Sequence, residues 1–357
     1  MGAVRGQFIR LIGKKKRAEK IELETIKRVL IPGGRIGDMV CETPFIRSLH
    51  NLLPDAKIDV YLDKVTAPLF RECPYVNVIE TESRSRFVHK VKVLRILASW
   101  YDAMKKRKKY DLCFDFTSGL RFYSILALKI TAPKYAISIF KEEKHGIKKD
   151  ELTIYDRYID KGSVKHMRDI CLKGAELLGG DISDRKYEIF LGNLEKKYEN
   201  YFFKDKINII FNYLGGTENK NLTMEEVRES CMRLCAVDKR IVVHIMTLPH
   251  KYNELKEEIK GWERIVTAPL TQDILEAAAV IKYADIMVSV DTGVVHIASA
   301  FNIPVISIFP DNDNSIEYFS PVSDLSYVIK CSDRRYIRDF DKDEMVRDVR
   351  EILSKIK

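Results

Sequence analysis

The sequence lacks the features of a membrane-spanning, fibrous or disulfide-stapled chain. No stretch approaches the roughly 20 uncharged apolar residues of a membrane-spanning helix, and the basic start has neither the apolar core nor the cleavage site of a secretion signal. With 17 Gly and 11 Pro, collagen-like and low-complexity chains are excluded. The seven Cys are an odd number without dense spacing. They fit a reducing cytosol better than a disulfide framework, so we expect a cytoplasmic globular protein.

The excess of positive charge is confined to two segments. Residues 1–28 carry nine Lys and Arg against three Glu, a net charge of +6. Residues 84–109 carry ten Lys and Arg against Asp102, a net charge of +9. Because the 357 residues together are net +9, the rest of the chain is net −6. The sequence therefore predicts a slightly acidic globular body with two basic patches in its N-terminal half.

The first basic segment, residues 1–27, is expected to be an extension ahead of the first domain. Four of its apolar residues recur at helical spacing: Val4, Phe8, Leu11 and Ile12. A run of four cations follows at residues 14–17. Such a segment can lie as a helix on an anionic membrane surface. Gly2, Gly6 and Gly13 favour the alternative, a solvated and partly disordered tail, because glycine is a poor helix former.

The second basic segment, residues 84–109, interleaves its cations with apolar and aromatic residues. This pattern predicts an amphipathic helix that buries a face containing Trp100 and Tyr101 and is basic on the other. Charge of one sign on that face favours an acidic partner, which could be a phosphate, a carboxylate or a nucleic acid. The alternative is an ordinary solvated helix face.

Short β-branched runs alternate with helical patterns along the rest of the chain. Ten strands are expected, at residues 28–33, 57–62, 77–80, 111–116, 135–140, 207–212, 240–246, 264–269, 285–290 and 304–309. The alternation predicts an α/β fold with two doubly wound, Rossmann-like domains that face a cleft. We expect the domains at residues 28–190 and 207–340, a linker at 191–206, and a final helix at 341–357 that packs back toward the first domain.

A glycine-rich turn follows the first expected strand. Gly33 and Gly34 allow a tight exit from the strand, and Gly37 would let the backbone approach a ligand before Asp38 opens a helix. The spacing does not match the G-x-G-x-x-G of a dinucleotide-binding turn. Asp38 could be a helix N-cap or a general base, and its position alone favours the cap.

Two loops of the second half carry the features of an anion site. Residues 285–309 form a buried strand that runs into Asp291-Thr292-Gly293 and a short helix, whose first N–H groups could hold a diphosphate. His296 lies one turn into that helix, as a phosphate contact or as a core histidine. The glycine-rich loop at residues 213–222 contains Thr217 and Lys220, and Lys220 would supply a point charge for phosphate.

Two of these motifs in this order resemble glycosyltransferase family 9, the ADP-heptose:lipopolysaccharide heptosyltransferases. They are G-D-x(4)-T-P at residues 37–44 and D-T-G-x-x-H at residues 291–296, and the similarity extends over about residues 28–310. The resemblance implies the two-domain GT-B fold and no cofactor beyond the nucleotide-sugar substrate. It also implies Asp38 as general base. Lys220 and the backbone of Thr292 and Gly293 would hold the donor diphosphate.

The resemblance implies further roles and has two departures. Asp291 would touch the donor sugar, with Thr217 and His296 close to the donor and Gly34 and Gly37 in the turn between donor and acceptor. Asn221, Leu222 and Thr223 stand where the family usually has a Trp-Pro pair. The segment after residue 246 also departs from the family pattern for the donor ribose, which leaves the nucleoside and any role of Glu254 open.

The resulting hypothesis is an inverting, metal-independent transfer of heptose from ADP-heptose to a Kdo/heptose inner-core lipopolysaccharide. The partners would be the nucleotide-sugar and an anionic glycolipid, on the cytoplasmic face of the inner membrane. Four cations of the second basic segment are the expected acceptor contacts: Arg84, Arg86, Lys90 and Arg95.

Three alternatives to this hypothesis remain. Within the family, the chain could transfer another sugar, such as N-acetylglucosamine, or modify another surface glycan. An NAD-dependent oxidoreductase is disfavoured by the glycine spacing. A nucleic-acid-binding protein is disfavoured because no helix-turn-helix, RNA-binding or zinc-finger signature is present.

Overall fold

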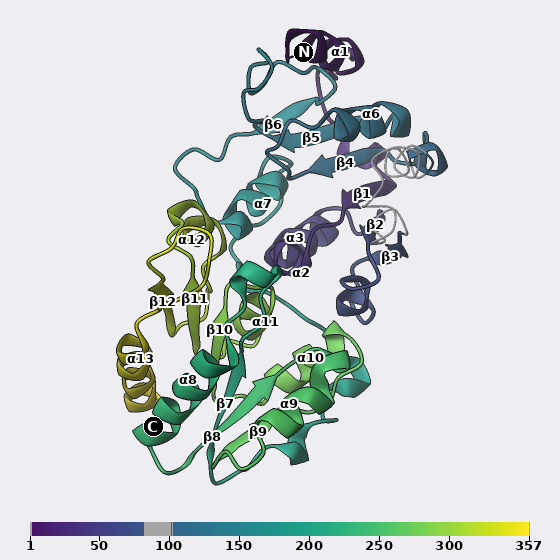
Figure 1. Ribbon diagram of the computed structural model, residues 1–357. Coiled ribbons are helices and arrows are strands. Elements are labelled where there is room, and N and C mark those ends of the chain that lie inside the picture. Colours follow the sequence, from purple (N-terminus) through teal and green to yellow (C-terminus); the bar gives the residue numbers. More distant parts are fainter. Residues whose placement is uncertain (1, 82–100, 102, 357) are drawn as a thin grey trace. The chain divides into compact units, whose positions relative to one another are not determined.

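The computed structural model describes residues 2–81, 101 and 103–356, without the side chains of residues 2–4. The chain forms two compact units (Figure 1). The first contains Met1–Gly34 and Glu42–Arg185, and the second contains Arg35–Cys41 and Lys186–Lys357. The short helix α2 (Ile36–Cys41), which carries Asp38, therefore belongs to the second unit although the chain on both sides of it belongs to the first.

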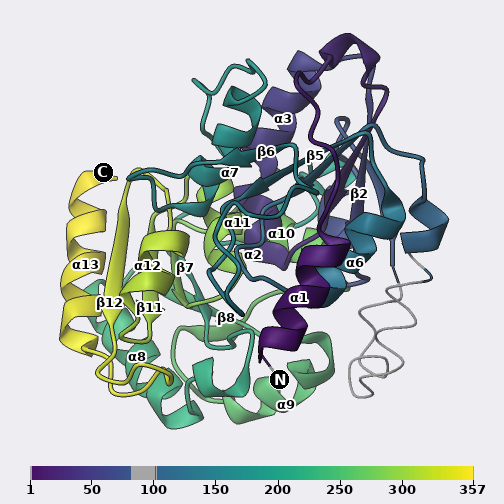
Figure 2. The same ribbon diagram turned by 90° about the horizontal axis from the view of Figure 1, so that it is seen from above.

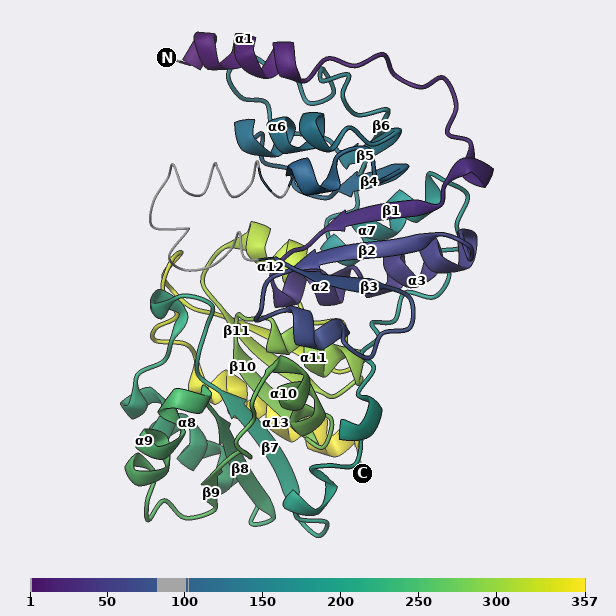
Figure 3. The same cartoon turned by 90° about the vertical axis from the view of Figure 1, so that its right-hand side faces the viewer.

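The first unit is built on a six-stranded parallel sheet of order β3-β2-β1-β4-β5-β6 (Figure 3). Its strands are β1 (Arg28–Pro32), β2 (Lys57–Leu62), β3 (Asn77–Glu80), β4 (Leu112–Asp115), β5 (Tyr135–Ile139) and β6 (Arg157–Ile159). Helices α3 (Thr43–Leu52) and α7 (Met167–Glu176) pack on each other and cover the face that carries Phe114. Helix α6 (Phe122–Thr131) covers the opposite face, with Leu30 and Cys113.

The second unit repeats this architecture with the strand order β12-β11-β10-β7-β8-β9. The strands are β7 (Ile207–Asn212), β8 (Ile241–Met246), β9 (Ile265–Thr267), β10 (Ile286–Val290), β11 (Val305–Phe309) and β12 (Ser326–Lys330). The helices are α8 (Met224–Val237), α9 (Tyr252–Glu258), α10 (Ile274–Ile281), α11 (Val294–Ala300), α12 (Asp313–Phe319) and α13 (Lys342–Lys355). Every residue of β8, β10 and β11 is buried, as expected for strands that helices cover on both faces.

The predicted fold class, two doubly wound α/β units, is confirmed, and all ten expected strands are present. The edge strands β6 and β12 were not expected from the sequence. The final helix, α13, packs on α8, β11 and β12 of its own unit (Figure 2). Its expected return toward the first domain stays a prediction, as does the linker at residues 191–206.

The structure tests the expectation for the first basic segment and describes only a small part of the second. Residues 2–12 form helix α1 (Gly2–Ile12), which packs on α6, so the alternative of a disordered tail is wrong. Most of the second segment, with Arg84, Arg86, Lys90 and Arg95, lies outside the described residues. Among its described residues, Tyr101 was expected on a buried face but is 61% exposed, whereas Ala103 is buried.

A buried histidine fixes the chain where it enters the second sheet. His244 of β8 is fully buried, and its Nε2–H donates to Oδ1 of Asn208 at 3.1 Å. Its Nδ1 has no hydrogen-bond partner in the described part of the chain. The ring packs on Phe202, 4.9 Å between centroids, in the segment that precedes β7. Burial lowers the pKa of His244 to about 4, because the charged ring would lose its hydration.

This pKa predicts a loss of stability in mild acid. The unfolded chain protonates His244 near its ordinary pKa of about 6.5, so protons bind the unfolded state first as the pH falls from 7 toward 4. We expect this residue alone to lower the free energy of unfolding by about 2 kcal/mol between pH 7 and pH 5. His244→Leu should remove that part of the pH dependence in urea unfolding. His250→Gln, which changes an exposed histidine, should retain it. Equal pH dependence in His244→Leu and the wild type would contradict the assignment.

Candidate functional site

The turn that carries Asp38 is packed on the helix that follows the Asp291-Thr292-Gly293 loop. Helices α2 and α11 are in direct contact, and the contact is made where both lack side chains. A Cβ on Gly37 would lie 2.9 Å from the His296 ring, and a Cβ on Gly293 would lie 2.8 Å from Ile36. Neither distance is compatible with a real side chain. Packing of the two motifs on each other therefore requires a glycine in each, at residue 37 and at residue 293.

Asp38 is the third residue of α2 and is half-buried. Its Oδ2 accepts a hydrogen bond from the backbone N–H of Arg35 at 3.0 Å, which ties the carboxylate to the start of the helix. This is the reciprocal contact of a capping box rather than an N-cap, because Asp38 lies inside the helix. In the described part of the chain, no other group is bonded to the carboxylate, so Oδ1 can accept a proton.

The loop before α11 presents two backbone donors. The N–H groups of Thr292 and Gly293 bond to no acceptor within the described residues. The side chain of Asp291, at the end of β10, instead pairs with Lys220 Nζ. The ion pair joins the D-T-G loop to the glycine-rich loop after β7, and the binding of an anion by these two loops stays a prediction.

The glycine-rich loop is folded tightly on itself. The N–H of Leu222 donates to the carbonyl of Tyr213 at 3.0 Å and closes the loop at its base. A Cβ on Gly215 would collide with the Cβ of Lys220. Lys220 ends the 3₁₀ turn η5 (Glu218–Lys220), and Thr217 precedes this turn with an exposed side chain. The fold of the loop thus aims Lys220 at Asp291.

His296 is a packed core histidine, one of the two alternatives that the sequence left open. The residue is 4% exposed, and its Nδ1 lies 3.6 Å from Sγ of Cys41 in α2. Its ring is edge-on to Tyr187 and Phe319, with centroids about 6 Å apart. Cys41 also contacts the hydroxyl of Tyr187 at 3.2 Å. Packing of α2 on α11 is thus one role of His296, and a contact with phosphate stays a prediction.

A polar cluster in the first unit was missed by the sequence analysis. Asp115 lies at the carboxyl end of β4, the edge where this type of sheet binds ligands. Lys141, which is buried, donates to its Oδ2 at 2.8 Å, and the hydroxyl of Tyr155 donates to the same oxygen. Burial alone would raise the pKa of Asp115, but the Lys141 ammonium and these hydrogen bonds hold it below its usual value. Asp115 lies inside the strand expected at residues 111–116, and an acid near the carboxyl end of that strand was the available signal.

Within residues 2–81, 101 and 103–356, no three His, Cys, Asp or Glu side chains are grouped as a metal site would require. None of the helices in these ranges has the length and hydropathy needed to cross a membrane.

Gly34 lies in the turn directly before α2. The residue before it, Gly33, has no room for a side chain, because a Cβ there would collide with the carbonyl of Tyr61.

Comparison with known proteins identifies the family of the chain. Residues 106–348 match the family model of glycosyltransferase family 9 (heptosyltransferase). A 90-residue segment is 37% identical to a lipopolysaccharide heptosyltransferase 3 of Escherichia coli, although the match spans only 23% of each protein. Over 299 residues, the chain is 25% identical to lipopolysaccharide heptosyltransferase 3 of strain K12, covering 78% of this chain and 80% of that one.

A solved structure with the same fold is the Escherichia coli heptosyltransferase WaaC with ADP-2-deoxy-2-fluoro heptose. It superposes with a TM-score of 0.65 and 18% identity, over 92% of this chain and all of that one. The GT-B architecture implied by the motifs is therefore confirmed. Since the family match extends over more than half of the sequence, the chain belongs to glycosyltransferase family 9 (heptosyltransferase) and is a glycosyltransferase.

Proposed function

We propose that the chain transfers heptose from ADP-heptose to the inner core of lipopolysaccharide, with inversion at the anomeric carbon and Asp38 as general base. The observation that carries the proposal is the packing of α2 on α11, which holds the acid turn against the D-T-G loop within one unit. The donor is supported by the ADP-heptose analogue named with WaaC. The acceptor class is supported by the lipopolysaccharide heptosyltransferases among the relatives.

In this mechanism Asp38 removes the proton from the acceptor hydroxyl. The oxygen of that hydroxyl attacks the anomeric carbon from the side opposite to the diphosphate, and the carbon–oxygen bond to ADP breaks. The bond from Arg35 N–H holds one carboxylate oxygen of Asp38, so that the other is oriented toward the proton. The proton remains on Asp38 until it is released to solvent.

The negative charge that develops on ADP is stabilised by groups of the second unit. The backbone N–H groups of Thr292 and Gly293 and the ammonium of Lys220 would donate to the diphosphate. An ammonium has three N–H donors, so Lys220 can bond to phosphate while it keeps its contact with Asp291. With these donors in place, we propose that the transfer needs no metal ion.

The acceptor proposed here is an anionic glycolipid at the cytoplasmic face of the inner membrane. Its phosphates and carboxylates would bind cations of the first unit, for which Arg84, Arg86, Lys90 and Arg95 stay the sequence-based candidates. The chain would then associate with the membrane from the cytoplasm, as a peripheral protein.

Substitution of the proposed base separates chemistry from donor binding. We expect Asp38→Asn to lower kcat by about a thousandfold while the affinity for ADP-heptose stays unchanged. The amide oxygen of Asn can still accept from Arg35 N–H, so α2 should remain folded. Asp273→Asn is the matched control, since the Asp273 carboxylate also accepts from backbone N–H groups at a helix start. Substantial turnover by Asp38→Asn would rule out the base assignment.

Removal of the loop cation should act on donor binding. We expect Lys220→Gln to weaken ADP binding by roughly tenfold in a calorimetric titration, because a charge-assisted bond to phosphate is lost. Lys197→Gln provides the control: it removes an equivalent ion pair, of Lys197 with Glu276 at 2.6 Å, which lies in the same unit and joins no part of the D-T-G loop. If both variants bind ADP equally well, Lys220 is not a phosphate ligand.

The donor class can be tested without an acceptor. A ligand that binds only the folded state raises the melting temperature, so we expect ADP-heptose to stabilise the protein more than UDP- or GDP-sugars at equal concentration. The test is needed because the segment after β8 forms α9 with an exposed Glu254, where the family pattern is absent. Greater stabilisation by UDP-N-acetylglucosamine would favour the alternative sugar.

A further inference from the structure

Helix α1 lies against the rest of the first unit where glycines leave room, at Gly6 and at Gly13 just after the helix. A Cβ on Gly6 would collide with the carbonyl oxygen of His145, and a Cβ on Gly13 would lie 2.9 Å from the Leu152 side chain. Between these glycines, Ile9 is fully buried in a cluster with Leu152 and other residues of the first unit. The helix therefore lies close to the body of the protein on its glycine face.

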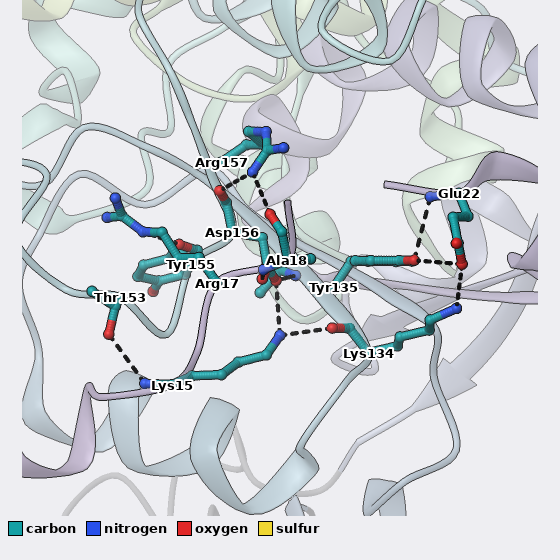
Figure 4. A network of polar contacts seen from close by, with 11 residues as sticks. Lys15, Arg17, Ala18, Glu22, Lys134, Tyr135, Thr153, Tyr155, Asp156 and Arg157 are labelled. Atoms are coloured by element: carbon teal, nitrogen blue, oxygen red, sulfur yellow. Dashed lines mark hydrogen bonds and ion pairs between the residues drawn. The ribbon is translucent and has the colours of Figure 1, made fainter. Parts of the chain in front are cut away.

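Polar contacts fix both the helix and the chain that follows it. Arg10 pairs with Glu151, and this bond holds the pKa of the Glu151 carboxyl below its usual value. Lys15 Nζ bonds to the buried Asp156 at 2.8 Å and to the carbonyl of Lys134 at 2.7 Å (Figure 4). Arg17 donates to the carbonyl of Tyr155 at 3.1 Å. Helix α1 is thus presented in a fixed orientation.

Two of the large apolar residues of α1 lie on its outer face. Phe8 is 56% exposed and Leu11 is 65% exposed, and their spacing of three places them side by side. An ordinary surface helix carries polar residues on its outer face and keeps its large apolar residues in the core, as α1 does with Ile9 but not with Phe8 or Leu11. An outer face of this kind is typical of a helix that lies in a membrane interface.

Unpaired cations flank these two apolar residues. Arg5 is three residues before Phe8, and Lys14 is three residues after Leu11. Arg5, Lys14 and Lys16 are exposed, and none of them has a carboxylate partner within the described part of the chain. By contrast, Arg10 and Lys15 of the same segment are paired. The exposed surface of α1 and of the chain that directly follows it therefore combines free positive charge with exposed apolar area.

We propose that helix α1 is the membrane-contact surface of this protein and lies flat on an anionic bilayer. Phe8 and Leu11 insert at the level of the headgroups, while Arg5, Lys14 and Lys16 bind lipid phosphates. The proposal rests on the membrane association proposed above and specifies the surface that makes it.

A second copy of the chain fits this surface less well. A stable dimer buries more than about 1,000 Å², and two large apolar side chains provide only a small part of that area. The three unpaired cations of one copy would also face those of the other, and like charges oppose association. Anionic lipid matches both the charge and the size of the patch.

Binding of the full chain to lipid vesicles tests the proposal. We expect co-sedimentation with vesicles that contain phosphatidylglycerol, weaker binding to pure phosphatidylcholine, and a decrease with added salt. The double variant Phe8→Ser/Leu11→Ser should bind at least about tenfold more weakly. Val65→Ser is the matched control, because Val65 is 64% exposed in the same unit and lies outside α1. The triple variant Arg5→Gln/Lys14→Gln/Lys16→Gln should lose most of the salt-sensitive binding.

The melting temperature separates a loss of lipid binding from a loss of folding. The melting temperature of the double variant should equal that of the wild type, whereas Ile9→Ser should lower it because a buried side chain is lost. Wild-type binding by the double variant, or no binding by any form, would overturn the proposal. Sedimentation velocity that shows an α1-dependent dimer would overturn it as well. Binding of ADP-heptose, measured on the same variants, reports on the proposed sugar transfer independently.

Discussion

The close approach of Gly37 and Gly293 is the contact on which the arrangement of the site depends. The two residues meet where α2 packs on α11, and a methyl group on either one would push the helices apart. Because Asp38 directly follows Gly37 and Thr292 directly precedes Gly293, this single contact fixes the backbone of the acid turn against that of the D-T-G loop. The buried contacts of His296 with Cys41 and Tyr187 support it from the side. A short helix thereby gains a fixed place that its own six residues could not maintain.

The ion pair between Lys220 and Asp291 adds the third loop to the same arrangement. Without a ligand, an isolated ammonium on a flexible glycine-rich loop would sample many positions, and ordering it would cost conformational entropy on binding. The contact with Asp291 removes much of that freedom in advance. Gly215 contributes as well, because only a residue without a side chain lets the loop fold back over Lys220. The groups that we propose to bind phosphate are therefore held in place by contacts among the loops themselves.

The sequence predicted what depends on local pattern and missed what depends on distant contacts. Buried β-branched runs located ten strands, whereas β6 has three residues and β12 is partly exposed, so neither shows a buried run. The glycine-aspartate motifs and the glycine-rich loop indicated Asp38, Lys220 and the D-T-G loop as candidates, and their roles stay predictions. No local pattern could decide the role of His296, because Cys41 is 255 residues away in the sequence. The cluster of Asp115, Lys141 and Tyr155 was missed for the same reason.

Helix α1 shows how a correct propensity can lead to a wrong expectation. Glycine does weaken an isolated helix, by roughly 1 kcal/mol per residue relative to alanine, and this argued for a disordered tail. In the folded protein, Gly6 and Gly13 allow the helix to contact the carbonyl of His145 and the side chain of Leu152, which larger residues would prevent. The same contacts use Arg10 and Lys15 internally. Some cations of this segment therefore hold the helix in place, and only the others remain for an anionic partner. The net charge of the segment overstates how many cations are available to that partner.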